Sequence, residues 1–254
     1  MAEDPRMQSA ARALARSHRL VVFTGAGVSK ESGIPTFREP ETGLWARYDP
    51  MELATCEAYV RQPEFVWGWY EHRFGATAAA SPNPGHLAIV ELERLLPRVS
   101  VVTQNIDGLH QRAGSSDVVE LHGSMLRFKC LSGQHTGFVL DDFVGQDEKP
   151  PRCPECGELL RPDVVWFGEP LPGDAIDRAQ ALSADCDVML VVGTSGVVYP
   201  AAAMPLLAAE AGAIVIDVNP ERDALAAAAE IFLQGPGGKV LPELAAAVRE
   251  HLAG

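Results

Sequence analysis

Four side chains that could do chemistry follow two short, largely apolar runs of the sequence. Gln104, Asn105 and Asp107 come after the run V-S-V-V-T, and His122 follows the run V-V-E-L. Each run is typical of a buried parallel strand, and ligands of open α/β sheets bind outside the carboxyl ends of such strands. Taken singly, these residues could cap a helix or close a turn. As a set, an amide pair, a carboxylate and an imidazole at neighbouring strand ends predict a catalytic site.

A glycine-rich turn marks a further strand end nearer the N-terminus. The apolar run L-V-V-F-T leads directly into Gly25, Ala26, Gly27 and, two residues on, Ser29. A Gly-x-Gly turn after a strand lets the backbone approach a phosphate, and the helix that follows offers free N–H groups. The glycine pattern of a dehydrogenase would place a third glycine where this chain has Lys30. The turn therefore predicts a dinucleotide site that is not that of a dehydrogenase.

Strand-like runs alternate with helix-like segments along the whole chain, which predicts a doubly wound parallel sheet. Residues 187–192 and 213–218 indicate further buried strands, and residues 231–233 an edge strand. We expect helices at residues 1–18, 87–96, 174–184, 201–211 and 241–252, and a turn at residues 235–238. In the turn before the helix at residues 87–96, we interpret His86 as a capping or turn residue and not as a ligand.

Composition limits the classes of protein that this chain can be. Of its 254 residues 47% are hydrophobic, which is enough for a full core, and the formal net charge is −13. That charge argues against a general nucleic-acid or anionic-membrane binder. No apolar run approaches the ~20 residues that span a bilayer, and the N-terminus carries no signal-peptide pattern. We expect a cytoplasmic protein whose five cysteines are thiols or metal ligands.

Three of the cysteines lie in one segment. Cys130 is followed at a distance by Cys153 and Cys156 in C-P-E-C-G, and a Cys-x-x-Cys turn points both thiolates at one tetrahedral ion. A structural zinc normally has four protein ligands, and His135 or a water could supply the fourth. Two alternatives stay open: a degenerate site that binds metal weakly, and a metal-free segment held by packing.

Four separated motifs together resemble the sirtuins, the NAD-dependent protein deacylases. In order they are G-A-G-V-S-K-E-S-G-I-P-T-F-R, G-L-W, T-Q-N-I-D-G-L-H and L-H-G, and the later segment R-P-D-V-V-W-F-G-E extends the match to nearly the whole chain. The resemblance implies NAD as co-substrate and acylated-lysine proteins as partners. It also implies a Rossmann-like NAD-binding domain with an inserted smaller lobe, helical in one part and zinc-ribbon-like in the other. The expected NAD-binding domain comprises residues 1–38, 76–123 and 163–254, and the smaller lobe residues 39–75 and 124–162.

The same resemblance assigns roles at the strand ends. His122 and Asn105 are the catalytic residues: His122 takes a proton from the ribose hydroxyls, and Asn105 and Asp107 position the nicotinamide and ribose. A histidine with a pKa of ~6.5 suits a general base at neutral pH. The implied NAD contacts are Gly25, Ala26, Gly27, Ser29, Thr36, Phe37, Arg38, Trp45, Gln104, Asn105, Ile106, Asp107, Gly193, Thr194, Ser195, Asn219, Pro220, Glu221 and Gly237.

Tyr70 and Arg73 could recognise an acidic group. They are three residues apart, so on a helix they share a face, and a phenol beside a guanidinium can bind a carboxylate. Alternatively Arg73 is a solvated surface charge. The pair resembles the sirtuin subgroup that removes succinyl and malonyl groups, in which a small residue, here Ala54, widens the acyl pocket. An extended run at residues 160–169 suits backbone pairing with a substrate peptide; alternatively it is an ordinary strand that returns to the core, with Val165 and Trp166 as core residues. The implied substrate contacts are Ala54, Tyr70, Arg73, Val164, Phe167, Gly168, Glu169 and Val197.

The cysteine segment departs from the sirtuin pattern. Sirtuins carry two Cys-x-x-Cys pairs there, and this chain has Gly133 where the partner of Cys130 is expected. The implied zinc ligands are therefore Cys130, Cys153 and Cys156, and the fourth ligand stays open between His135 and a water.

Other functions could use the same nucleotide pocket. A mono-ADP-ribosyltransferase or an NAD glycohydrolase differs from a deacylase in whether nicotinamide release requires an acylated peptide. A non-catalytic NAD-sensing module would keep the glycines but could lose the imidazole, and the presence of His122 argues against it.

Overall fold

Among the residues that the structure describes, the larger of two sheets has six strands, all parallel, in the order β3-β2-β1-β7-β8-β9. Numbered along the chain, these six strands have the order 3-2-1-4-5-6 of dinucleotide-binding sheets, which reverses direction between β1 and β7. The Rossmann-like, doubly wound sheet expected from the sequence is thus confirmed. The strands are β1 (Leu20–Thr24), β2 (Val99–Thr103), β3 (Val118–Glu120), β7 (Val188–Val192), β8 (Ile214–Asn219) and β9 (Ile231–Gln234).

The structure is a computed structural model that describes residues 4–34, 49–143, 148–222 and 224–254. The expected NAD contacts Thr36, Phe37, Arg38 and Trp45 lie outside the described residues.

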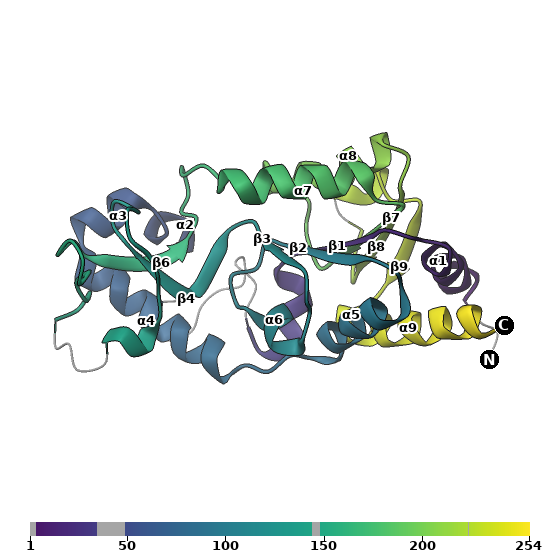
Figure 1. The fold of residues 1–254 in the computed structure, drawn as a ribbon, viewed down its shortest axis with the longest axis horizontal. Coiled ribbons are helices and arrows are strands. Elements are labelled where there is room, and N and C mark those ends of the chain that lie inside the picture. The colour runs from purple at the N-terminus through teal and green to yellow at the C-terminus, as the bar shows by residue number, and fades with distance from the viewer. Residues whose placement is uncertain (1–3, 35–48, 144–147, 223) are drawn as a thin grey trace.

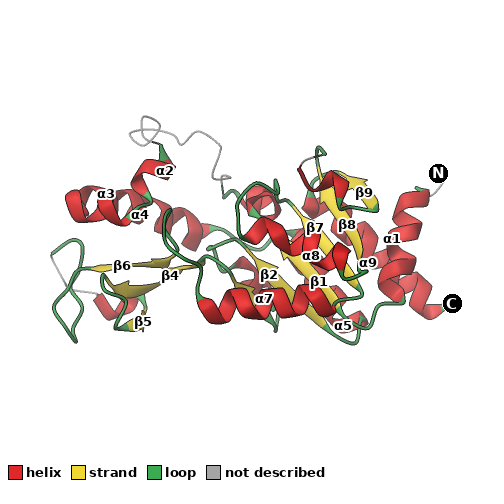
Figure 2. Ribbon diagram, turned by 90° about the horizontal axis from the view of Figure 1, so that it is seen from above, coloured by secondary structure: helices red, strands yellow, loops and turns green. Residues whose placement is uncertain are grey.

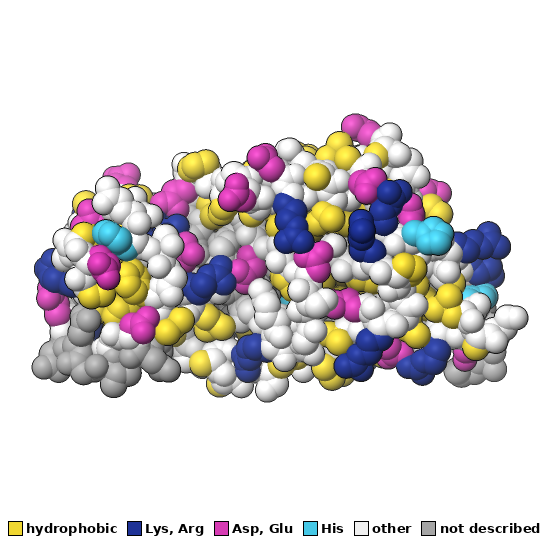
Figure 3. Space-filling model, viewed as in Figure 1, with side chains coloured by type: hydrophobic (Ala, Val, Ile, Leu, Met, Phe, Trp, Pro, Cys, Tyr) yellow, Lys and Arg dark blue, Asp and Glu magenta, His cyan; other side chains and the backbone are white. Residues whose placement is uncertain are grey.

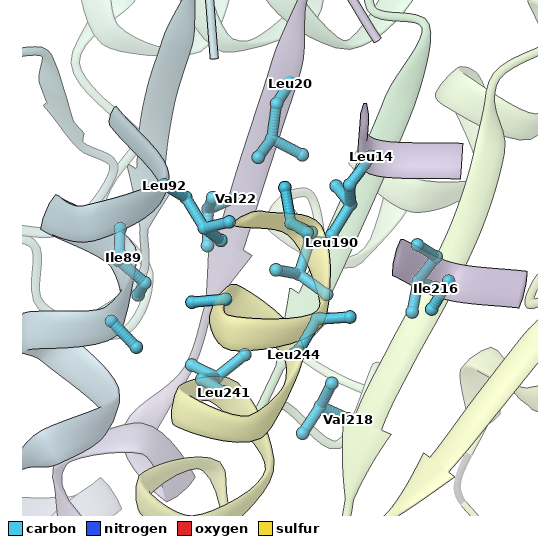
Figure 4. Packing of buried hydrophobic residues seen from close by; sticks show 14 of the residues in the cluster. Leu14, Leu20, Val22, Ile89, Leu92, Leu190, Ile216, Val218, Leu241 and Leu244 are labelled. Carbon is cyan, nitrogen blue, oxygen red and sulfur yellow. The ribbon is translucent and has the colours of Figure 1, made fainter. Parts of the chain in front are cut away.

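Helices cover both faces of the larger sheet (Figure 1). On one face lie α1 (Pro5–Ala15), α5 (Pro84–Leu95) and α9 (Gly237–Ala253), and on the other α7 (Gly173–Asp185) and α8 (Met204–Glu210). Because both faces are covered, β1, β2 and β7 are buried at every position, which is why their sequences are apolar or β-branched at every position but Ser100. Figure 4 shows the first face, where side chains of the three helices meet those of the strands; its labelled residues are Leu14, Leu20, Val22, Ile89, Leu92, Leu190, Ile216, Val218, Leu241 and Leu244.

Two helix starts differ from the sequence expectation. Helix α5 begins at Pro84, because the Asn83 side chain accepts hydrogen bonds from Gly85 and His86, and His86 Nδ1 accepts from the Asn83 N–H. This reciprocal cap confirms the interpretation of His86 and adds a helical turn ahead of the apolar stripe. The turn expected at residues 235–238 is wrong for its second half, because α9 already begins at Gly237.

A smaller lobe lies at the far end of the molecule from the two termini (Figures 1 and 2). Its antiparallel sheet has the order β5-β4-β6, with β4 (Gly123–Cys130), β5 (Thr136–Phe138) and β6 (Leu160–Val164). The helices α2 (Pro50–Leu53), α3 (Cys56–Arg61) and α4 (Pro63–Ala79) pack on it through an aromatic core. That core contains Trp67, Trp69, Phe74, Phe128 and Trp166.

Short elements complete the described chain: α6 (Leu109–Ala113) and the 3₁₀ turns η1 (Ala26–Ser32), η3 (Leu140–Phe143), η4 (Ala201–Ala203) and η5 (Ala224–Ala227). In the part of the chain that the structure describes, no helix combines the length and apolarity needed to cross a membrane. Acidic, basic and apolar side chains are interspersed on the face seen in Figure 3.

Candidate active site

The expected site residues gather at the carboxyl ends of four adjacent strands. Gly25 follows β1, Gln104 follows β2, His122 lies just beyond β3 and Gly193 follows β7. The strand order reverses between β1 and β7, and sheets of this kind bind their ligands outside the carboxyl ends of the strands at such a reversal.

The glycines bring two strand-end loops into backbone contact. The Gly27 N–H donates to the Gly193 carbonyl at 2.8 Å, and the Gly25 N–H donates to the Val192 carbonyl at 3.1 Å. A Cβ on Gly27 would lie 2.7 Å from the Gly193 Cα, and Gly193 itself has φ +61°. Only glycine allows both the approach and the left-handed backbone. The turn after Gly25 continues as the 3₁₀ helix η1.

A buried hydrogen-bond chain joins the loops after β1 and β2. Asn105 Nδ2 donates to Ser29 Oγ at 3.1 Å, and Ser29 Oγ donates to Asp107 Oδ2 at 2.7 Å. Asp107 Oδ1 accepts from the Leu109 N–H at 2.9 Å, so the capping alternative applies to this carboxylate in part. Burial raises the pKa of Asp107, and the hydrogen bonds from Leu109 and Ser29 oppose that rise. These hydrogen bonds hold the Asn105 amide and the Asp107 carboxylate on either side of the Ser29 hydroxyl.

The imidazole of His122 is held in one tautomer. Its Nδ1 lies 2.8 Å from the Gln104 carbonyl oxygen, which can only accept a hydrogen bond, so Nδ1 carries the proton. Burial lowers the pKa of His122, and the hydrogen bond to Gln104 offsets part of this. At neutral pH the ring is therefore neutral, with Nε2 free of a proton and able to act as a base.

A pair of threonine hydroxyls, which sequence reasoning missed, holds the backbone of Asn105 by a hydrogen bond. Thr24 and Thr103 are register partners at the last positions of β1 and β2. Thr24 Oγ1 donates to Thr103 Oγ1 at 2.8 Å, and Thr103 Oγ1 accepts from the Asn105 N–H at 3.0 Å. His110 Nε2 lies 2.9 Å from Thr24 Oγ1, and burial lowers the pKa of His110 to about 3. The sequence signal that could have identified this pair was the threonine at the end of each of the two strands.

The remaining expected NAD contacts lie at the ends of β7 and β8. Gln104 Nε2 donates to Thr194 Oγ1 at 2.9 Å, and Asn219 Nδ2 donates to the Thr194 carbonyl at 3.2 Å. These bonds link three strand ends. Of the other expected contacts, Ala26, Ile106 and Ser195 are half-buried, Pro220 and Glu221 are exposed beyond β8, and Gly237 is buried against Val192.

Tyr70 and Arg73 project from α4, as the sequence predicts. Tyr70 is 2% exposed, and its hydroxyl oxygen accepts from Trp166 Nε1 at 2.7 Å. Burial raises the pKa of Tyr70 to about 12, so the phenol keeps its proton. Arg73 is half-buried with its guanidinium carbon 4.9 Å from the centre of the Trp69 ring, which differs from the alternative of a fully solvated charge. The Ala54 carbonyl accepts from the Phe167 N–H at 2.9 Å.

Beyond β6, the expected substrate segment has two characters. Phe167 is 41% exposed, and Gly168 has φ +85°; Val197, a further expected contact that lies beyond β7, is 50% exposed. Glu169, in contrast, receives hydrogen bonds from buried Arg161 at 2.5 and 2.9 Å and from the Trp166 N–H at 2.9 Å. Sequence reasoning missed Arg161, because an arginine between apolar residues has no pattern of its own.

Four possible metal ligands come together at the tip of the smaller lobe. The ligand atoms of Cys130, His135, Cys153 and Cys156 all lie within 4.8 Å of one another, and a tetrahedral zinc with Zn–S of about 2.3 Å needs sulfurs about 3.8 Å apart. Cys130 and Cys153 are buried. Gly133 has φ +77°, a conformation that a cysteine would adopt only with strain. The Cys₃His donor set fits a structural zinc, with His135 in the fourth position.

Comparison of the chain with models of known protein families identifies a family that fits this site geometry. Residues 25–200 match the model of the Sir2 family. The chain belongs to the Sir2 family. Among curated Sir2 proteins, it is 55% identical to NAD-dependent protein deacylase 2 of Pyrobaculum aerophilum, with 94% of each chain covered. It is 51% identical to NAD-dependent protein deacylase 1 of Pseudomonas aeruginosa, with 94% of this chain and 97% of the relative covered.

Solved Sir2 structures share this fold over nearly the whole chain. A Sir2 homologue in complex with NAD is 45% identical, with a TM-score of 0.90, covering 96% of this chain and 94% of the other. Sir2Af2 bound to a myristoylated histone peptide is 38% identical, with a TM-score of 0.78 and 98% of both chains covered. Those two proteins bind NAD and an acylated peptide, respectively.

Proposed function

We propose that this chain is an NAD-dependent protein-lysine deacylase that releases nicotinamide and O-acyl-ADP-ribose. The observation that carries the proposal is the neutral His122, whose Nε2 is left free by the Nδ1–Gln104 hydrogen bond, on the strand edge that also bears Asn105 and Asp107. Membership of the Sir2 family and the names of its relatives support the same activity.

In the proposed reaction the protein forms no covalent bond with the substrates and mainly positions them. Nicotinamide leaves its ribose as a good, neutral leaving group, so the chain must hold the ribose and present the acyl-lysine oxygen to C1′. In our proposal Asn105 and Asp107, with Gln104 beside them, hold the carboxamide and ribose. The acyl oxygen–C1′ bond forms as the C1′–nitrogen bond breaks.

His122 then acts as the general base. Its Nε2 accepts a proton from the ribose hydroxyls, and the 2′-oxygen attacks the imidate carbon. Addition of water and cleavage of the bond to the lysine nitrogen release free lysine and the O-acyl product. A side chain that is neutral at physiological pH is required, and burial of His122 favours that state.

Acidic acyl groups are the finer part of the proposal. Tyr70 supplies a buried hydroxyl that stays protonated, Arg73 supplies a half-buried cation, and Ala54 leaves room beside them. A succinyl or malonyl carboxylate would accept hydrogen bonds from both donors, and charge-assisted bonds of this kind are the stronger ones. The substrate backbone would pair along residues 164–169, with Val197 on the opposite wall.

The zinc of this enzyme is structural in our proposal. Cys130, His135, Cys153 and Cys156 would hold it, and it would stabilise the smaller lobe. The proposed division of the chain keeps residues 39–75 and 124–162 in that lobe.

Mass spectrometry of acetyl-lysine and succinyl-lysine peptides incubated with the protein and NAD tests the activity. We expect loss of both acyl groups and formation of the matching O-acyl-ADP-ribose. Nicotinamide release that is equally fast without any acylated peptide would instead identify an NAD glycohydrolase, and ADP-ribose attached to protein would identify a mono-ADP-ribosyltransferase.

A further inference from the structure

The hydrogen bond between Trp166 and Tyr70 joins two side chains that are almost fully buried. Trp166 is 1% exposed and Tyr70 is 2% exposed, and the indole nitrogen lies 2.7 Å from the phenol oxygen. An indole N–H can only donate, so the phenol oxygen is the acceptor, and the phenol's own proton is left to donate to a different group. Accepting one hydrogen bond also polarises a hydroxyl and strengthens it as a donor.

Contacts with Arg161 and Tyr59 fix the orientation of the Trp166 ring. The Arg161 guanidinium carbon lies 3.2 Å from the ring centre, and Arg161 is itself held by two hydrogen bonds to Glu169. Glu169 also accepts from the Trp166 backbone N–H at 2.9 Å. The Tyr59 ring lies against the indole with its centre 5.2 Å away. Rotating the indole would disrupt this stack, so its N–H has one available direction.

The neighbours of Trp166 in sequence tie the same segment to two expected site residues. The Val165 N–H donates to the His122 carbonyl at 2.9 Å, and the Phe167 N–H donates to the Ala54 carbonyl at 2.9 Å. Three consecutive residues therefore contact the base, the phenol and the small residue of the acyl pocket. Trp166 therefore stands in sequence between the residue that binds the His122 backbone and the residue that binds the Ala54 backbone.

We propose that Trp166 is a positioning residue for acyl-group selection, because its N–H occupies one side of the Tyr70 oxygen and directs the phenol proton toward an acyl carboxylate. This inference rests on the proposed function, since it needs Tyr70 to face the acyl group. Trp166 touches no substrate in this scheme and acts only through Tyr70.

The test replaces Trp166 by Phe, which keeps an aromatic ring near Arg161 but removes the indole N–H together with part of the ring volume. Trp67→Phe is the matched control: Trp67 is 2% exposed in the same core, and within the described residues its indole nitrogen has no hydrogen-bond partner. For each protein, kcat and KM are measured with succinyl-lysine and acetyl-lysine peptides of one sequence at saturating NAD. Tyr70→Phe and the double variant W166F/Y70F complete a cycle.

We expect Trp166→Phe to lower the succinyl-to-acetyl ratio of kcat/KM by about 2- to 12-fold, the effect of one hydrogen bond. The change should appear mainly as a higher KM for the succinyl peptide, and the double variant should lose no more than Tyr70→Phe alone. Trp67→Phe should keep the wild-type ratio.

Each other outcome has a distinct meaning. If Tyr70→Phe lowers the ratio and Trp166→Phe leaves it unchanged, or if Trp166→Phe lowers both activities in parallel as Trp67→Phe does, the role of Trp166 is refuted and the proposed function stands. If the wild-type protein removes acetyl but no succinyl groups, the acidic-acyl proposal fails and the role of Trp166 fails with it.

Discussion

The Nδ1 atom of His122 lies 2.8 Å from the carbonyl oxygen of Gln104, and this contact assigns the proton of the ring. A carbonyl cannot donate, so the proton sits on Nδ1, and Nε2 is left as the nitrogen that serves as base in the proposed function. The same Gln104 donates through its side chain to Thr194 at 2.9 Å. One residue thus orients the base and links the strand ends on which it depends.

Replacing His122 by Asn should separate the structural bond from the base. The Asn side chain offers an N–H toward the Gln104 carbonyl but has no basic nitrogen at the position of Nε2. We expect kcat for deacylation to fall by about 10²- to 10⁴-fold, with the melting temperature within a few degrees of wild type. A variant that keeps more than a tenth of the wild-type kcat would refute the assignment of His122.

The pH dependence should report the same imidazole. Burial, the largest influence, lowers the pKa of His122 from its ordinary value of ~6.5. The neutral form is the active base, so kcat/KM should be full above that pKa and fall as the pH drops through it. We expect the midpoint of the acid limb to lie below 6.5 in a profile from pH 4.5 to 9 at constant ionic strength. A midpoint above 7 would contradict the buried, neutral base.

Sequence reasoning recovered the sheet because its signal is local. Runs such as Leu20–Thr24 and Val188–Val192 are buried on both faces, so their apolar composition identifies them directly. The strand ends of Gly25 and His122 follow from the same runs. Helix starts were less accurate where a polar cap decides them, as at Asn83, whose side chain starts α5 ahead of the apolar stripe.

Contacts between distant segments were beyond the sequence. Trp166 reads as an ordinary core residue, and only the fold shows that its N–H reaches Tyr70, 96 residues away. The Thr24–Thr103 pair likewise needs the register of two strands to be known. His135 could be named only as one of two candidates for the fourth zinc ligand, since a loop of unknown path separates it from Cys153.

Arg73→Met tests the cation of the acyl pocket. Methionine keeps most of the apolar stem and removes the charge-assisted bonds to an acyl carboxylate. We expect the succinyl-to-acetyl ratio of kcat/KM to fall by at least about tenfold. Arg61→Met on the neighbouring helix, at an exposed position, is the control. An equal loss of both activities would show that Arg73 does not select the acyl group.

Metal content tests the Cys₃His set. We expect about one equivalent of zinc in the purified wild-type protein, measured by mass spectrometry of the element. His135→Ala should lower zinc retention in a mild chelator and lower the melting temperature, because a structural zinc contributes to folding. His72→Ala, at an exposed position on α4 of the same lobe, should change neither. Less than a tenth of an equivalent of zinc in the wild-type protein would refute the zinc site and indicate that packing alone holds the lobe together.

Gly27→Ala tests whether the glycine turn serves contact between strand-end loops. The added methyl group would lie 2.7 Å from the Gly193 backbone, where nothing flexible can give way, and overpacking of this kind costs about 1–3 kcal/mol. Gly75→Ala is the opposite case, since Gly75 is exposed within α4 and a methyl group there meets no atom within 4 Å. It should raise the free energy of unfolding by about 0.5–1 kcal/mol. Urea unfolding of both variants measures the two effects, and a Gly27→Ala protein as stable as wild type would mean that the two loops do not meet as described.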